Sequence, residues 1–222
     1  MILKSILLPI FLFLIGGCSY PSADEVKVDY STPIITTENE NAGIQISDLF
    51  VFVGEKIEVA EFRPGPDSMD QAFKAKYRVV EKVYGEFTGN VIEFEVYDHY
   101  GIPPFSKFKH VLLFVSKAKG KLYHEKYQYF DVYQTVEGRW ASCGDPYRFD
   151  EYHRKDFTAQ KLEFDPPIML VRQKPSEDET NEIYPAPYFS MQPNKAKCLM
   201  GAYVEDLFLV KKNGVLKARG LF

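Results

Sequence analysis

The stretch from Leu49 to Phe62, LFVFVGEKIEVAEF, begins the part of the chain that we expect to fold. Phe50 and Phe52 alternate with other residues before Gly54, and a second alternating run begins at Ile57. Alternation with a period of two is typical of a β-strand with one buried face. A glycine inside such a pattern indicates a β-bulge, which changes the face that points inward. The stretch therefore predicts one long, bent strand.

Two alternating runs follow. In residues 73–83, Phe73, Ala75, Tyr77 and Val79 fall on one face, with lysine and arginine between them. In residues 91–98, VIEFEVYD, the apolar Ile92, Phe94 and Val96 share one face, whereas Glu93 and Glu95 take the other. Both runs predict strands with one buried and one solvated face.

Three further stretches complete the strand pattern. Residues 111–115, VLLFV, do not alternate, which is typical of a strand buried on both faces. Residues 123–132 and 135–141 supply two more candidate strands. Five or six strands at close spacing, with little helical periodicity between them, predict a mainly β protein built on a small antiparallel barrel.

Four segments in this order carry a resemblance to a known family. They are LFVFVGEKIEVAEF (49–62), YRVVEKVYGEFTGNVIEFEVYD (77–98), KFKHVLLFVSK (107–117) and GRWASCG (138–144). Their order resembles the netrin-like module, the OB-type barrel that is also found in tissue inhibitors of metalloproteinases. The resemblance covers about residues 46–146 and implies an OB-like barrel. Members of the family usually carry several disulfides, but this chain allows at most one.

The start of the chain has the pattern of an export signal. Lys4 precedes an uncharged apolar run, ILLPIFLFLI, at residues 6–15, which is too short to span a bilayer. The following Ile15-Gly16-Gly17-Cys18 resembles the lipobox of bacterial lipoproteins. That resemblance implies cleavage after residue 17, lipidation of Cys18 with acyl chains such as palmitate, and a membrane anchor. In a Gram-negative cell, Ser19 after the cysteine implies the outer membrane, with the protein facing the periplasm.

The lipidated cysteine also affects the family comparison. The metalloproteinase inhibitors chelate zinc through a free amino-terminal cysteine, and acylated Cys18 lacks that group. Residues 18–43 are polar and acidic, so we expect a flexible tether between the anchor and the barrel. Residues 44–222 then form a single domain.

Cys143 and Cys198 are the two remaining cysteines of this chain. An exported protein folds where disulfides form, so we expect these two residues to be bonded to each other. Two buried free thiols are the alternative.

The region from about residue 149 predicts a C-terminal extension of the barrel. Residues 168–172 form a candidate strand, and residues 174–195 contain four prolines and an acidic run, which indicates a long loop. Residues 200–211 keep helical spacing, with Asn213-Gly214 as a C-cap. The same dipeptide is also suited to a hairpin, but we favour a short helix.

Tyrosines provide the candidate binding site. Within KLYHEKYQYFDVY, Tyr123, Tyr127, Tyr129 and Tyr133 all fall on one side of an extended chain. If that side faces outward, they form a platform for sugar rings or a peptide. If it faces inward, they belong to the core.

No catalytic signature accompanies this site. His99, His110, His124 and His153 are scattered singly, without the spacing of a metal site, and we expect them to be solvated. The sequence predicts no metal and no cofactor. With 27 Lys and Arg against 31 Asp and Glu, the chain is mildly acidic, which argues against nucleic acid as a partner.

Two classes of function remain. We favour a non-catalytic envelope lipoprotein that binds a protein or glycan partner. The alternative is a lipid-anchored periplasmic hydrolase whose site is assembled from dispersed His, Asp and Glu residues.

Overall fold

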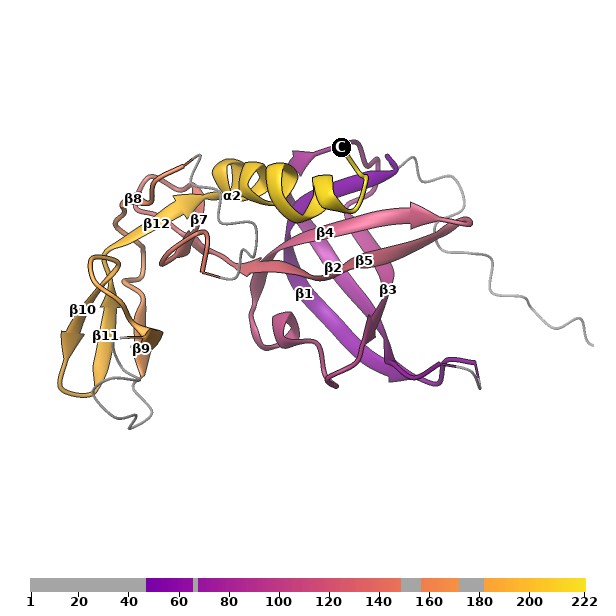
Figure 1. Ribbon diagram of the computed structural model, residues 1–222, viewed down its shortest axis with the longest axis horizontal. Coiled ribbons are helices and arrows are strands. Elements are labelled where there is room, and N and C mark those ends of the chain that lie inside the picture. Colours follow the sequence, from indigo (N-terminus) through magenta and orange to yellow (C-terminus); the bar gives the residue numbers. More distant parts are fainter. Residues whose placement is uncertain (1–46, 66–67, 149–156, 172–181) are drawn as a thin grey trace, which may run out of the picture. The chain divides into compact units, whose positions relative to one another are not determined.

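The computed structural model describes residues 47–65, 68–148, 157–171 and 182–222 (Figure 1). The predicted signal peptide, Cys18 and the tether lie outside these ranges. A closed ring of five strands contains most of the inner core, and two smaller sheets follow. The ring strands are β1 (Leu49–Phe62), β2 (Gln71–Tyr84), β3 (Val91–Asp98), β4 (His110–Ala118) and β5 (Lys121–Asp131).

The ring closes in the order β1-β2-β3-β5-β4. Four of the five pairings between neighbouring strands are antiparallel, but β3 and β5 run parallel and are paired at Glu95 and Tyr123. The prediction of a wholly antiparallel barrel is therefore wrong for the pairing of β3 with β5. Between β3 and β5 the chain passes through the 3-10 helix η1 (Pro104–Lys107) and β4, and such a crossover, unlike a hairpin, brings strands together in parallel.

Strand β1 bends at Gly54, as the sequence predicts. Its pairing with β2 shifts between Val53 and Gly54 and again between Lys56 and Glu58. Phe50 and Phe52 lie in the inner core, and their rings stack with centroids 4.9 Å apart. The predicted inward position of Ile57 is wrong: this side chain is 45% exposed, because it lies within the second shift.

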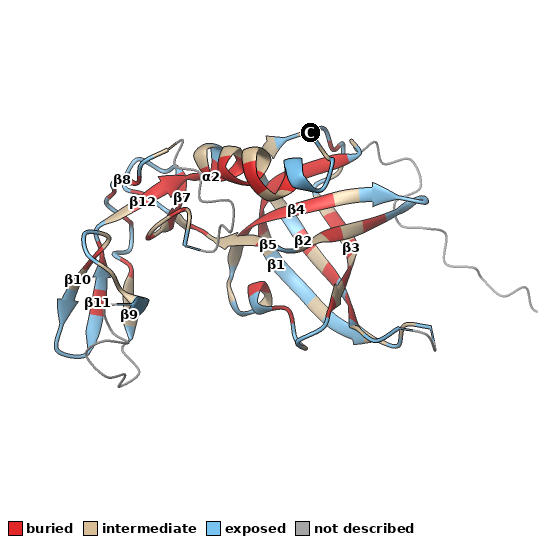
Figure 2. Cartoon of the chain, viewed as in Figure 1, coloured by how far each residue is buried: buried red, intermediate tan, exposed pale blue. Residues whose placement is uncertain are grey.

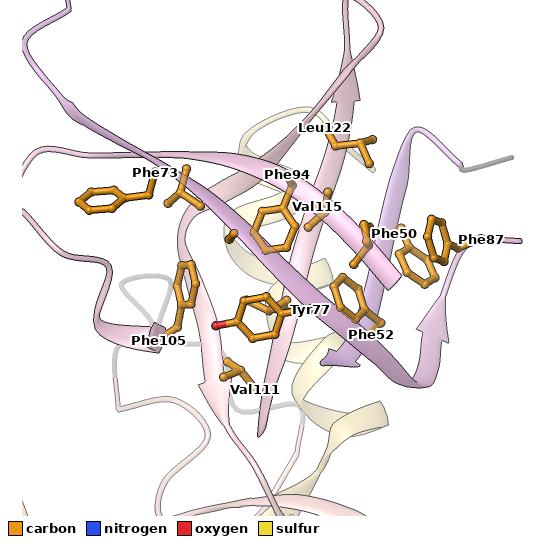
Figure 3. Packing of buried hydrophobic residues seen from close by; sticks show 14 residues of the cluster. Phe50, Phe52, Phe73, Tyr77, Phe87, Phe94, Phe105, Val111, Val115 and Leu122 are labelled. Atoms are coloured by element: carbon orange, nitrogen blue, oxygen red, sulfur yellow. The ribbon is translucent and has the colours of Figure 1, made fainter. Parts of the chain in front are cut away.

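The inner core fills the ring with aromatic and branched side chains (Figure 3). The alternating faces predicted for β2 and β3 are confirmed, since Phe73, Tyr77 and Phe94 all point inward. The Tyr77 hydroxyl has no hydrogen-bond partner in this core, and burial raises the pKa of Tyr77 well above its ordinary value.

Strand β4 is buried on both faces, as its unbroken apolar run predicts. Val111, Leu113 and Val115 belong to the inner core. Leu112 and Phe114 point away from it into a second core, under the C-terminal helix. Figure 2 shows β4 as a continuous buried stretch over most of its length.

The second core is closed by helix α2 (Val204–Lys211), which continues into a π-helical turn, η2 (Lys212–Leu216). Leu207 and Leu216 are each at most 1% exposed there. The helix favoured by the sequence is thus confirmed over the hairpin. Two details differ: residues 200–203 form a strand, and Gly214 lies inside the π-helical turn instead of capping the helix.

Two small sheets follow the ring. One has the order β6-β7-β12-β8 and the other β10-β11-β9. Their strands are β6 (Tyr133–Gln134), β7 (Trp140–Cys143), β8 (Gln160–Lys161), β9 (Met169–Val171), β10 (Phe189–Gln192), β11 (Lys195–Cys198) and β12 (Met200–Tyr203). The strand predicted at 168–172 is confirmed as β9. The strand predicted at 135–141 is replaced by β6 and β7, which a turn separates.

The prediction of a long loop over residues 174–195 is wrong in its described part. Phe189 pairs with Cys198 and Gln192 with Lys195, so β10 and β11 form a hairpin whose turn is Pro193-Asn194. The two strands have only four residues each, so the prolines and acidic residues around them dominate the sequence pattern and indicate a loop.

Candidate functional site

Strand β5 carries a large bulge. On β4, Leu113 pairs with Tyr129 and Val115 pairs with His124, so residues 125–128 of β5 lie opposite Phe114 alone. The bulge reverses the alternation of β5. His124 is buried before it, whereas Tyr129 packs against the inner core after it.

The predicted tyrosine platform does not form, because the bulge separates its members. Tyr123 is half-buried against Tyr97, with ring centroids 6.2 Å apart, and Tyr127 is exposed. Tyr129 packs on the inner core, and Tyr133 packs against a third core, which lies between the small sheets. The prediction that all four share one face is wrong.

Ionic contacts hold the side chains of the bulge. Glu125 accepts hydrogen bonds from the Ser116 hydroxyl and, at 2.8 Å, from Nη1 of Arg219. The Lys126 ammonium donates to Asp70 Oδ2 at 2.7 Å. This contact lowers the pKa of Asp70 and raises that of Lys126.

The backbone of the bulge is held as well. Arg219 Nη2 donates to the carbonyl of Lys126 at 2.9 Å. The carbonyl of Gln128 lies 2.9 Å from His124 Nε2, which must donate because a carbonyl only accepts. Burial lowers the pKa of His124 to about 4, so the ring stays neutral near neutral pH.

Tyr127 sits at the tip of this anchored bulge. Its φ of 67° is in the left-handed region, which costs a bulky residue about 1–3 kcal/mol and persists only when its surroundings hold it. The ring is 43% exposed, and its centroid lies 5.9 Å from that of the highly exposed Tyr100. The bulge thus presents an aromatic ring at the surface.

A cavity of about 600 Å³ opens beside this ring. Four parts of the chain form it: the first residue of η1, the bulge with the end of β5, the segment around Cys143, and the C-terminal helix with the residues that follow it. Its lining residues are Pro104, Tyr127, Gln128, Tyr129, Phe130, Asp131, Ser142, Cys143, Gly144, Asp145, Pro146, Arg148, Leu207, Lys211, Val215 and Arg219.

The cavity wall combines apolar surface with both signs of charge. Asp131 is half-buried, and its partial removal from water raises its pKa; its Oδ2 accepts a hydrogen bond from the Tyr133 hydroxyl at 2.9 Å. Asp145 accepts the backbone N–H of Tyr147 at 2.9 Å. The Lys211 ammonium lies 5.0 Å from the ring centroid of Phe130.

Gln128 contributes an unsatisfied acceptor. This residue lines the cavity and is only 7% exposed, and its buried Oε1 has no hydrogen-bond partner. Its Nε2 donates to the carbonyl of Lys126 at 3.2 Å. A buried acceptor without a donor costs about 1–3 kcal/mol, which a suitable donor would recover.

The predicted disulfide is present between Cys143 and Cys198. It joins β7 to β11, and therefore one small sheet to the other, and Cys143 also lines the cavity. The bond fixes the segment that forms one wall of the cavity.

The histidines that the structure describes lie in different surroundings. His99 lies 3.5 Å from Asp70, and His110 packs on Trp140 with centroids 4.6 Å apart. The expectation of a solvated ring is wrong for His124, which is buried in contact with Phe105. His153 lies outside the described residues. Within the described ranges, no group of three or more His, Cys, Asp or Glu side chains is arranged to hold a metal ion.

Sequence reasoning did not find Gln128, Lys211 or Arg219 as site residues. Arg219 reaches the bulge from 94 residues downstream, and no local pattern marks such a contact. Among the helices that the structure describes, none has the length and apolar character of a membrane span.

Comparisons with known proteins do not assign the chain to a family. No family model matches it, and searches of curated proteins and of solved structures found no match. The fold is therefore described by its own features: a mainly β domain with a closed five-strand ring and a disulfide.

Proposed function

We propose that this chain is a lipid-anchored protein of the bacterial cell envelope whose β domain binds a protein or glycan partner without chemical turnover. One observation carries the binding role: an anchored bulge holds Tyr127, in a strained conformation, at the rim of a cavity of about 600 Å³. Sites of about 300–1,000 Å³ that combine apolar walls with a few polar groups are typical of ligand binding.

We also propose that the barrel is of the OB type and netrin-like. The five-strand closed ring supports this assignment, because a five-stranded barrel is the defining feature of OB-folds. The inhibitory chemistry of the metalloproteinase inhibitors is not part of the proposal, since Cys18 is proposed to carry acyl chains.

The proposed location rests on residues 1–19. The lipobox-like Ile15-Gly16-Gly17-Cys18 supports lipidation, and Ser19 supports the outer membrane, with the domain facing the periplasm. The disulfide between Cys143 and Cys198 is in keeping with an oxidising compartment. Several buried acyl chains, at about 0.8 kcal/mol per CH₂, suffice for stable anchoring.

The anchor is tested by labelling cells with radioactive palmitate. We expect label in the wild-type protein and none in Cys18→Ala, which should also leave the membrane fraction. Label in Cys18→Ala, or a wild-type protein without label, would contradict the proposed anchor.

The binding role is tested by mild cross-linking in intact cells, followed by purification from membranes. We expect a partner to be recovered repeatedly with the wild-type protein and with Tyr123→Ala, but to be depleted with Tyr127→Gly. The Tyr123 control removes a tyrosine from the same strand that does not line the cavity. Equal recovery with all three proteins would show that the cavity is not the binding site.

A further inference from the structure

We propose that the ligand of the cavity beside the β5 bulge is a neutral saccharide, with the ring of Tyr127 lying against one face of a sugar. This inference rests on the proposed binding function and specifies the chemical class of the ligand. Three properties of the cavity lead to it: the mixed charge of its wall, its aromatic rim and its unsatisfied acceptor.

The charges on the wall favour a neutral ligand. Acidic Asp131 and Asp145 line the same cavity as basic Arg148, Lys211 and Arg219. Arg219 already pairs with Glu125 at 2.8 Å, and each aspartate already accepts a hydrogen bond. An ion of either sign would therefore meet like charge on one part of the wall, which costs binding energy. A polyhydroxyl ligand donates and accepts hydrogen bonds, so it suits both kinds of group.

The aromatic rim suits the apolar face of a sugar. Tyr127 is 43% exposed, and Tyr129 and Phe130 are further aromatic residues that line the cavity. Tyrosine offers a flat apolar surface with a polar edge. A pyranose has the complementary form, because its C–H bonds cover one face and its hydroxyl groups surround the ring.

The unsatisfied Oε1 of Gln128 requires a donor. A sugar hydroxyl supplies one after a rotation of the terminal amide toward the cavity, a torsion that is soft in glutamine. That rotation releases the 3.2 Å contact between Nε2 and the Lys126 carbonyl, which Arg219 continues to satisfy. The bulge backbone therefore stays anchored while the amide turns.

The test is isothermal titration calorimetry with the full-length lipoprotein in a detergent that has no sugar headgroup. The probes are cellotetraose, chitotetraose and maltotetraose, each up to millimolar concentration. We expect at least one of them to bind, with an affinity weakened about tenfold or more by Tyr127→Gly and unchanged by Tyr123→Ala. Gln128→Met, which keeps the side-chain volume but removes the acceptor, should weaken binding severalfold.

Tyr127→Gly separates binding from folding. Glycine adopts a φ of 67° without strain, so the variant should keep a melting temperature close to that of the wild type. No binding of any of the three probes by the folded wild-type protein would overturn the proposal, as would binding that Tyr127→Gly leaves unchanged. If the partner recovered by cross-linking still depends on Tyr127 while no saccharide binds, the binding function stands and the saccharide is ruled out.

Discussion

Arg219 and Glu125 are 94 residues apart in the sequence, yet Nη1 of the arginine lies 2.8 Å from Oε2 of the glutamate. The same guanidinium donates through Nη2 to the carbonyl of Lys126. One side chain after the C-terminal helix thus holds both a side chain and a backbone carbonyl of the β5 bulge. The shape of the bulge depends on a residue at the other end of the folded domain.

Replacing Arg219 by Ala should loosen the bulge and leave the ring intact. Glu125, whose side chain is only 13% exposed, loses its ion pair with Arg219. We therefore expect the free energy of unfolding to fall by about 1 kcal/mol. Amide hydrogen exchange should quicken in peptides that cover residues 124–129. Lys217→Ala, at an exposed position of the same segment, is the control and should change neither quantity. Unchanged exchange in Arg219→Ala would mean that the guanidinium does not hold the bulge.

Gly54 should tolerate no larger side chain. A Cβ at this position would lie 2.9 Å from ring atoms of both Phe52 and Tyr77 in the filled interior. Overpacking of this kind costs about 1–3 kcal/mol, so Gly54→Ala should lower the unfolding free energy by that amount in chemical denaturation. At Gly65 an added Cβ meets nothing within 4 Å, so Gly65→Ala serves as the matched control. Equal stability of the two variants would contradict the packing described for the ring.

The protein should lose stability in mild acid through His124. Burial lowers the pKa of this ring to about 4, whereas the unfolded chain binds the proton near pH 6.5. Between these values the unfolded chain holds more protons, so stability falls as the pH falls through this window. His124 alone should account for about 3 kcal/mol of that loss.

The measurement is the free energy of unfolding at several pH values for the wild type and for His124→Gln. Glutamine can still donate to the carbonyl of Gln128 but does not titrate. The variant should be less stable at neutral pH and should show a shallower decline in acid. Parallel curves for the two proteins would mean that His124 is not protonated on unfolding.

Loss of the disulfide should destabilise the domain. Cys143 and Cys198 close a loop of 55 residues, for which the chain-entropy model gives about 4 kcal/mol. We expect Cys143→Ala with Cys198→Ala to lower the unfolding free energy by about 2–4 kcal/mol. A reducing agent should weaken the wild type to a similar extent and leave the double variant unchanged. Insensitivity of the wild type to reduction would refute this contribution.

Much of the ring could be predicted because its signals are local. The apolar run from Val111 to Val115 identifies a strand with two buried faces, and Gly54 identifies the bulge in β1. Both predictions depend only on side-chain size and period along a few residues. The disulfide could be predicted from the cysteine count together with the predicted export signal.

The site could not be predicted because its signals are not local. Residues 125–128 read Glu-Lys-Tyr-Gln and contain no glycine, proline or asparagine to mark a bulge. Contacts from Asp70, Ser116, His124 and Arg219 stabilise it. A bulge of this kind reverses the alternation that placed four tyrosines on one face. Likewise, burial of Leu216 in the second core outweighed the capping tendency of Asn213-Gly214.

The two buried faces of β4 also affect how the chain acquires its structure. Leu113 packs against other residues of the inner core, but Phe114 packs against the C-terminal helix, which begins at Val204 and is synthesised later. During synthesis, therefore, the completed ring strands display an apolar stripe for as long as it takes to make the remainder of the domain.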